Sequence, residues 1–165
     1  MTTATRTPGW RGARGEWYVV AQLALIALVF FGPRTLPGWV PWPAPIARVA
    51  ALLGGALMLA GGALFVAGLL RLGRNLTPLP HPKADATLVR SGPSRLVRHP
   101  IYAGGIGLAF GWALLVQGGL TLLYAGALLV FLDLKSAREE RWLVGKFPEY
   151  RDYQRRVRKL IPFVH

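Results

Sequence analysis

The segment LVRHPIYAGG, residues 96–105, places reactive side chains at the start of a long apolar run. Arg98 supplies a permanent cation, and His99 supplies a ring whose two nitrogens can take part in hydrogen bonds. Tyr102 and Gly104 follow inside the apolar run, where one offers a hydroxyl-bearing ring and the other a bare backbone. A membrane anchor needs only one or two of these features, so their combination predicts a site.

A second group of charged residues, Glu139, Glu140 and Arg141, follows the next apolar run. Carboxylates accept hydrogen bonds from ammonium and hydroxyl groups, and arginine binds carboxylates through paired N–H groups. Each residue also has a purely structural explanation. Arg98 can anchor to lipid headgroups, the His-Pro pair can start a helix, and the glutamates can form a solvated helix face. Only a fold that gathers them gives them a joint role.

The elements that must position these residues are three apolar stretches, at 17–31, 46–70 and 101–132. One membrane span needs about 20 residues, so the third stretch is too long for a single span. Its Gln-Gly-Gly sequence at 117–119 predicts a tight turn between helices over 101–116 and 119–135. We therefore predict an all-α integral membrane protein with four transmembrane helices, of which the third and fourth form a tight helical hairpin. That hairpin returns Glu139 and Glu140 to the side of Arg98 and His99.

The remaining segments are polar, and we expect one domain over 1–165. A basic tail (1–16) precedes the transmembrane core (17–135), and cytoplasmic helices (136–165) follow it. The last segment predicts a helix, a break at Pro148 and a basic amphipathic helix lying on the membrane surface. The first apolar stretch begins like a signal peptide but lacks a clear cleavage site, so we expect it to stay as a helix.

The basic residues fix the expected orientation. Lysine and arginine number 20 against 7 acidic residues, a net charge of +13, and 18 of the 20 lie in the tail, in 71–98 or in 135–165. The positive-inside rule then places both termini in the cytoplasm. Since orientation explains the charge, we expect membrane lipids and no nucleic acid as partners. The composition, rich in Arg, Ala and Gly, is typical of a prokaryotic cell membrane protein from a high-GC genome.

Several kinds of chemistry are excluded or disfavoured. The chain contains no cysteine, which rules out disulfides and thiolate nucleophiles. Its three histidines are widely spaced and form no recognisable metal-ligand pair, so we predict no metal site. A pair of small residues, Gly107 and Gly111, has GxxxG spacing, which permits a dimer without requiring one, and the oligomeric state stays open.

The two polar motifs together resemble the isoprenylcysteine carboxyl methyltransferase family and its phospholipid methyltransferase relatives. The similarity covers about 92–162 and consists of GPSRLVRHPIYAGG, then EERWL, then FPEYRDY and a final Ile-Pro. LGRNLTPLP, at 72–80, is a further similar lead-in. Ser94 stands where the family usually has an aromatic residue, and Pro148 replaces a common glycine. Neither departure affects the charged elements.

The resemblance implies S-adenosylmethionine as methyl donor. It implies that His99, Glu139 and Glu140 bind this cofactor, that Tyr102 borders the adenosyl group, and that Gly104 allows a close approach. Arg98 or Arg141 would be the catalytic residue that holds the acceptor. The implied acceptor is an amphiphilic small molecule or a lipidated, for example prenylated, group, and carboxyl O-methylation is the favoured reaction.

Three alternatives stay open at this point. The first is N-methylation of a phospholipid amine by the same fold. The second is a binding protein whose catalytic site has degenerated, and the third is a lipid or steroid reductase that uses a nicotinamide cofactor.

Overall fold

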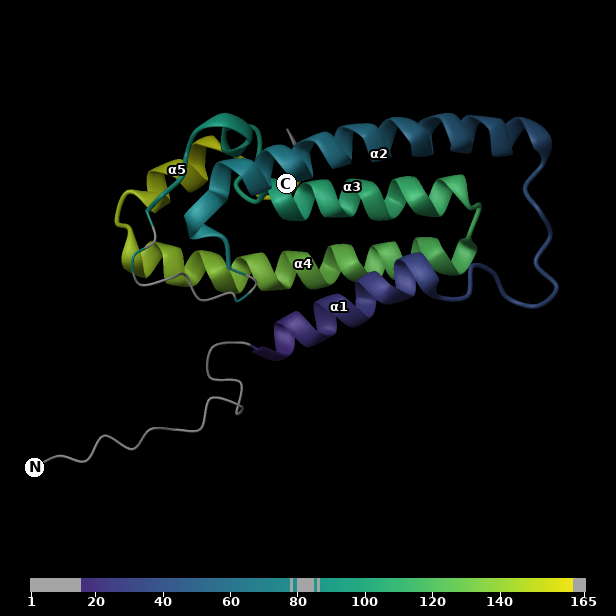
Figure 1. The fold of residues 1–165 in the computed structure, drawn as a ribbon, viewed down its shortest axis with the longest axis horizontal. Coiled ribbons are helices and arrows are strands. Elements are labelled where there is room, and N and C mark those ends of the chain that lie inside the picture. Colours follow the sequence, from purple (N-terminus) through teal and green to yellow (C-terminus); the bar gives the residue numbers. More distant parts are fainter. Residues whose placement is uncertain (1–15, 78, 80–84, 86, 162–165) are drawn as a thin grey trace, which may run out of the picture.

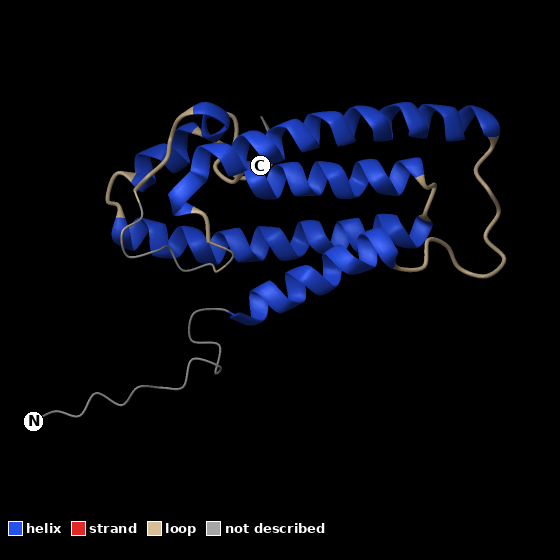
Figure 2. Cartoon of the chain, in the orientation of Figure 1, coloured by secondary structure: helices blue, strands red, loops and turns tan. Residues whose placement is uncertain are grey.

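The protein is a bundle of helices. The computed structural model describes residues 16–77, 79, 85 and 87–161, so the predicted basic tail lies outside the described residues except for Glu16. Within that part of the chain the structure has helices and loops but no strand (Figure 2). The only β-type contact between described residues is an isolated parallel bridge between Val97 and Arg158. The α-helices are α1 (Glu16–Phe31), α2 (Ala44–Leu72), α3 (Pro100–Leu115), α4 (Gly119–Lys146) and α5 (Tyr150–Arg156), and the 3₁₀ turns are η2 (Gly73–Asn75) and η3 (Gly92–Arg95).

Three helices run side by side, with α3 between α2 and α4, and α1 crosses α4 (Figure 1). Two segments, Ala44–Asn75 and Gly119–Lys146, are long and apolar enough to cross a membrane. The other two, Glu16–Phe31 and Pro100–Leu115, are shorter apolar helices. Large apolar side chains are exposed on the outer surfaces of α1, α2 and α4, including Trp17, Leu23, Leu52, Leu59, Leu70, Leu123 and Val130. Such a surface suits a lipid environment.

The first three predicted helices, over 17–31, 46–70 and 101–116, agree with α1, α2 and α3 to within two residues at each end. The predicted tight turn is also confirmed, and Gln117 adopts a left-handed φ of 51° there. The predicted helix over 119–135 instead continues to Lys146 without a break. Residues 135–146 contain no proline and several good helix formers, so nothing stops the helix before Pro148.

The last helix differs from its prediction. It spans only seven residues, Tyr150–Arg156, and the backbone is extended at Val157 directly after it. Its apolar face was expected on the membrane surface, but Tyr150 and Tyr153 are 2% and 7% exposed, and the later Leu160 is 1% exposed. That expectation was wrong, because this face packs against the end of the bundle instead. We call residues 150–161 the C-terminal segment and this end of the molecule the polar end.

A seam of glycines lets α2 and α3 pack backbone against backbone. A Cβ atom placed on Gly104 would lie 2.6 Å from the carbonyl oxygen of Gly61, and one on Gly111 would lie 2.7 Å from that of Gly54. A Cβ on Gly107 would lie 3.1 Å from the Cα atom of Gly61. The GxxxG pair is therefore used inside this chain, in the manner of small-residue interfaces between membrane helices.

Substitution of Gly104 by alanine should test this seam. Because the new methyl group would meet α2 backbone, we expect Gly104→Ala to lower the free energy of unfolding by about 1–3 kcal/mol. The matched control is Gly105→Ala, where the new Cβ meets nothing within 4 Å. This control should leave stability unchanged or raise it by up to ~1 kcal/mol. Thermal unfolding of the detergent-purified protein measures both, and equal melting temperatures would contradict the seam.

Candidate active site

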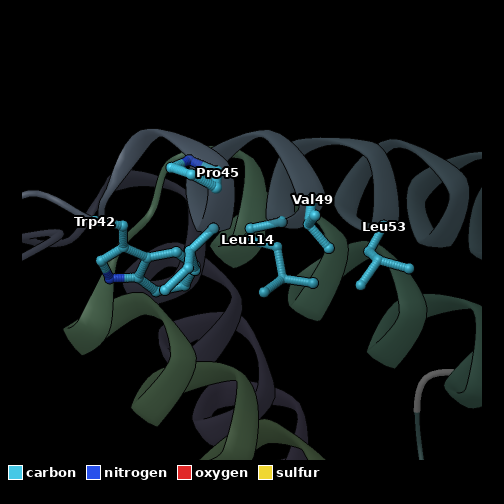
Figure 3. A pocket seen from close by; sticks show the side chains of 7 residues that line it. Trp42, Pro45, Val49, Leu53 and Leu114 are labelled. Atoms are coloured by element: carbon cyan, nitrogen blue, oxygen red, sulfur yellow. The ribbon is translucent and has the colours of Figure 1, made fainter.

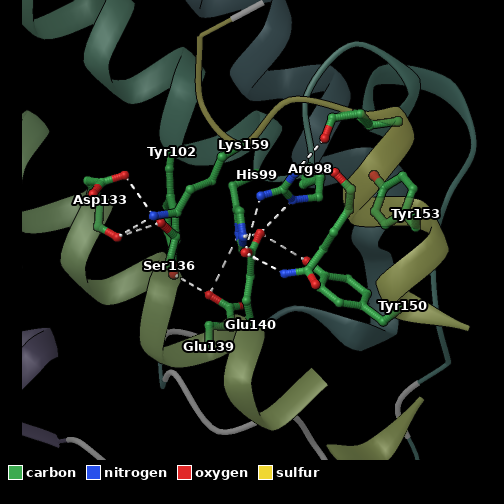
Figure 4. A network of polar contacts seen from close by, with 12 residues as sticks. Arg98, His99, Tyr102, Asp133, Ser136, Glu139, Glu140, Tyr150, Tyr153 and Lys159 are labelled. Atoms are coloured by element: carbon green, nitrogen blue, oxygen red, sulfur yellow. Dashed lines mark hydrogen bonds and ion pairs between the residues drawn. The ribbon is translucent and has the colours of Figure 1, made fainter. Parts of the chain in front are cut away.

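Five of the polar residues singled out in the sequence come together at the polar end (Figure 4): Arg98, His99, Tyr102, Glu139 and Glu140. Arg98 and His99 lie directly before Pro100, which is the first residue of α3. Proline is favoured at the first turn of a helix, so the sequence itself fixes where α3 begins. The tight turn at Gln117 sends α4 back along α3, and Glu139 and Glu140 then reach the same end. The predicted juxtaposition is confirmed.

The carboxylate of Glu140 is the centre of the contacts at this end, and we call it and its four partners the Glu140 network. Arg98 donates from Nε to Oε1 at 2.6 Å and from Nη2 to Oε2 at 3.2 Å. His99 Nε2 lies 3.1 Å from Oε1. Tyr150 donates its hydroxyl at 3.2 Å, and Gln154 donates from Nε2 at 2.8 Å. A carboxylate has about four lone-pair sites, so these contacts saturate Glu140.

Arg98 also ties the C-terminal segment to α3. Its Nη1 donates to the backbone carbonyls of Gln154 and Val157, so four of its five N–H groups have acceptors inside the protein. The backbone continues the link, because the amide of Arg98 donates to the carbonyl of Arg158 at 2.8 Å. A salt bridge of 2.7 Å between Lys159 and Asp133 joins the same segment to α4.

The two tyrosines of α5 act as neutral donors. Burial, followed by the nearby Glu140 charge, raises the pKa of the Tyr150 hydroxyl well above its ordinary value. Burial likewise raises the pKa of Tyr153 to about 12. Both hydroxyls therefore keep their protons at neutral pH, and Tyr153 donates its own to the carbonyl of Ser94.

Glu139 has a different environment from its neighbour. Its Oε2 accepts a hydrogen bond of 3.0 Å from the Tyr102 hydroxyl and lies 3.9 Å from His99 Nδ1. Its side chain is 24% exposed, compared with 9% for Glu140. The rings of His99 and Tyr102 stack with a centroid distance of 5.5 Å and an interplanar angle of 5°. The ammonium of Lys135 lies 5.3 Å from the centre of the Tyr102 ring. Glu139 therefore keeps acceptor capacity beside an aromatic surface.

Two predicted residues lie outside this group. Arg141 is exposed on α4 and takes part in none of the contacts that the described residues make at the polar end. Gly104 is buried, but its bare face is covered by the backbone of α2 at Gly61 and Phe65. Its close approach is therefore to α2. Its predicted approach to a cofactor finds no support in this packing.

The structure adds residues that sequence reasoning missed. Lys135 is 1% exposed and donates to the side chain of Gln22 in α1. Lys135 lies four residues before Glu139, so both are on one face of α4, and this spacing could have pointed to Lys135 from the sequence. Gln154 gave no signal at all, because its contact with Glu140 depends on the path of the C-terminal segment.

A hollow lined by apolar side chains lies at the opposite end of the bundle (Figure 3). It measures about 440 Å³ and is lined by Trp42, Pro45, Ile46, Val49, Ala50, Leu53 and Leu114. None of the described residues that line it carries a charge that could bind a polar cofactor. The convergent charged groups that define a site are at the polar end.

Comparison with known proteins assigns the family. A helical protein with membrane-length apolar helices and charged residues gathered at one end fits several classes of membrane enzyme. The profile of the family described as phospholipid methyltransferase matches residues 49–150, which include most of α2, all of α3 and α4, and the charged residues Arg98, Glu139 and Glu140. The chain belongs to this family, and it is a methyltransferase-family membrane protein.

Two relatives illustrate the range of the similarity. The chain is 28% identical over 152 residues to the cobalt-zinc-cadmium resistance protein CzcN of Cupriavidus metallidurans, covering 90% of this chain and 62% of that protein. It is 44% identical over 70 residues to methanethiol S-methyltransferase 1 of Bradyrhizobium diazoefficiens, covering 42% of this chain and 24% of that protein. The chain thus spans less than two thirds of the length of either relative.

Loss of the Glu140 charge should loosen the C-terminal segment. Glu140→Gln leaves the Arg98 guanidinium buried without a counter-charge, so we expect the free energy of unfolding to fall by about 3 kcal/mol. Trypsin should then cleave faster at the arginines of α5. Glu149→Gln makes the same chemical change on an exposed side chain and should stay within about 0.5 kcal/mol of the parent. If Glu140→Gln left the rate of trypsin cleavage and the melting temperature unchanged, Glu140 would not be the residue that holds the C-terminal segment against the bundle.

Proposed function

We propose that the protein is an integral membrane methyltransferase that uses S-adenosylmethionine and acts on an amphiphilic acceptor reached from the lipid. The observation that carries this proposal is the partly exposed carboxylate of Glu139 beside the stacked rings of His99 and Tyr102. S-adenosylmethionine carries a sulfonium, an α-ammonium and a ribose diol, all of which a carboxylate can bind. Its adenine is an aromatic surface that suits a neighbouring ring.

The two glutamates do not fit this donor equally well. Glu139 keeps lone pairs for a ligand, whereas Glu140 is saturated by its own network. We therefore assign donor binding to Glu139, His99 and Tyr102, and a supporting role to Glu140. The resemblance implied donor binding by both glutamates, because two adjacent helix positions do not show which partners each side chain has.

The donor supplies an electrophilic methyl group, and the protein must hold a nucleophile in line with it and keep water out. A carboxylate acceptor is already ionised at neutral pH and needs no general base, which favours carboxyl O-methylation. An amine acceptor, as in phospholipid N-methylation, would have to lose a proton, and Glu139 is the nearest partly exposed carboxylate to take it. Four of the five N–H groups of Arg98 already have acceptors, so Arg98 could hold an acceptor through paired N–H groups only by giving up one of these contacts.

A thiol is a third acceptor class, favoured by one observation. The 70-residue similarity at 44% identity is to a protein named as a methanethiol S-methyltransferase. A thiol is a strong nucleophile once ionised, and its ordinary pKa of about 8.5 makes a small ionised fraction available at neutral pH. A small thiol also needs no arginine to hold it.

The proposed topology has four membrane crossings, by α1, α2, α3 and α4, with both termini and the polar end in the cytoplasm. The distribution of lysine and arginine supports this orientation. Two of the four helices are short for a full span, so their ends would lie at the interface or the bilayer would thin locally.

Donor binding is the first test. Titration calorimetry of the purified protein should show saturable binding of S-adenosylmethionine and no binding of NADPH. Glu139→Gln should weaken donor binding by about 2 kcal/mol, close to thirtyfold, without lowering the melting temperature. Glu149→Gln is again the matched control and should bind normally. Binding of NADPH alone would support the reductase alternative, and binding of neither ligand would refute the proposal.

The acceptor is tested by methyl transfer in the presence of a donor carrying a labelled methyl group. Three acceptors are tested in separate reactions: an isoprenoid or fatty carboxylate, phosphatidylethanolamine and methanethiol. We expect label in the carboxylate. Label in only one of the three assigns the acceptor class. Donor binding with no label in any of them would point to the binding protein with a degenerate site.

A further inference from the structure

A second cavity lies beside the Glu140 network and has a different chemistry. It measures about 280 Å³ and is lined by Arg95, Leu96, Arg156, Val157 and Arg158, which we call the arginine pocket. Its two walls come from distant parts of the sequence, one from the end of η3 and the other from the C-terminal segment. The described lining contains three cations and no acidic residue.

The three arginines are exposed, and within the described part of the chain their side chains have no hydrogen-bond or ion-pair partner. Asp152, the acidic residue nearest to Arg156 in the sequence, pairs with Arg155 at 3.8 Å, and Glu140 is held by its network. Three like charges around one hollow repel one another, so an anion that enters the hollow relieves this repulsion. Guanidinium groups bind phosphate oxygens through paired N–H groups, which makes phosphate the best-matched anion.

The walls of the pocket are fixed by backbone contacts. Val97 and Arg158 form the isolated parallel bridge, and the amide of Arg98 donates to the carbonyl of Arg158. The carbonyl of Val157 accepts a hydrogen bond from the Arg98 side chain. The arginines are therefore carried on a backbone that is already positioned, which lowers the entropy lost when a ligand binds.

The pocket also lies where a lipid headgroup would be. Arg95 is five residues before Pro100, the first residue of the apolar helix α3. Leu96 in the lining is 56% exposed, and Ile161, just beyond the pocket, is 40% exposed. Apolar side chains next to cations are typical of a protein surface at the boundary between acyl chains and headgroups. A volume just under the ~300 Å³ lower end of small-molecule pockets admits a headgroup but not a whole lipid.

We propose that the arginine pocket binds the phosphate of an anionic membrane phospholipid. This inference depends on the membrane location of the protein and not on the methyl donor or acceptor. A bound headgroup would join the segment before α3 to the C-terminal segment from the outside, opposite the inner link made by Arg98.

The experiment compares two doubly substituted proteins that lose the same charge from the same segment. Arg156→Gln with Arg158→Gln removes two pocket arginines, and Arg151→Gln with Arg155→Gln removes two exposed arginines outside the pocket. Native mass spectrometry of the full chain in detergent measures binding of phosphatidylglycerol, with phosphatidylcholine as a neutral comparison. We expect the pocket variant to bind phosphatidylglycerol roughly tenfold more weakly and the control variant to change less than about twofold. Arg95→Gln alone should also weaken binding, because it lies on the other wall.

The outcomes separate the possible sources of phosphate. One tightly bound phosphatidylglycerol that is lost in the pocket variant and kept in the control supports the proposal. Equal losses in both variants would mean diffuse attraction by surface charge, and equal binding of both lipids would mean no anion site. Inorganic phosphate that competes at the same concentration as the lipid would assign the pocket to free phosphate. Each of these three results overturns the proposal.

Discussion

The negative charge of Glu140, buried at the end of a helical bundle, determines how the rest of the polar end is arranged. A buried carboxylate is tolerated only when it is paired and hydrogen-bonded. Here the partners come from both sides: Arg98 and His99 before α3, and Tyr150 and Gln154 from α5. The requirement to satisfy one charge therefore holds the C-terminal segment against the bundle.

This arrangement gives neighbouring glutamates different tasks. Successive residues of a helix point about 100° apart, so Glu139 contacts His99 but none of the other partners of Glu140. It lies instead beside Tyr102 and keeps part of its surface exposed. His99 connects the two, with one ring nitrogen near each carboxylate. The rigid Arg98–Glu140 ion pair lies next to the accessible carboxylate of Glu139. This geometry suits a binding site, because the ion pair holds the surrounding side chains in place before a ligand arrives.

Much of this could be predicted from sequence, and the misses have physical reasons. The apolar runs and the Gln-Gly-Gly turn predict the hairpin, and the hairpin brings Glu139 and Glu140 to His99. The pattern predicted a helix that breaks at Pro148, but not that this helix is continuous with the preceding apolar one, because a membrane boundary is not a helix boundary. It also missed that α5 turns its tyrosines inward and that Lys135 reaches Gln22, since contacts between residues distant in sequence depend on packing. Spacing along one helix does not contain that information.

The central claim is that the methyl donor binds at the polar end, against the His99–Tyr102 stack and Glu139. Ultraviolet cross-linking of radiolabelled S-adenosylmethionine to the intact protein, followed by tryptic mapping, tests it most directly. Saturable label is expected at Tyr102, within the fragment 99–135, with loss of that label when S-adenosylhomocysteine is in excess. Label confined to the fragment 49–71 of α2, which lines the apolar hollow at the opposite end, would contradict it.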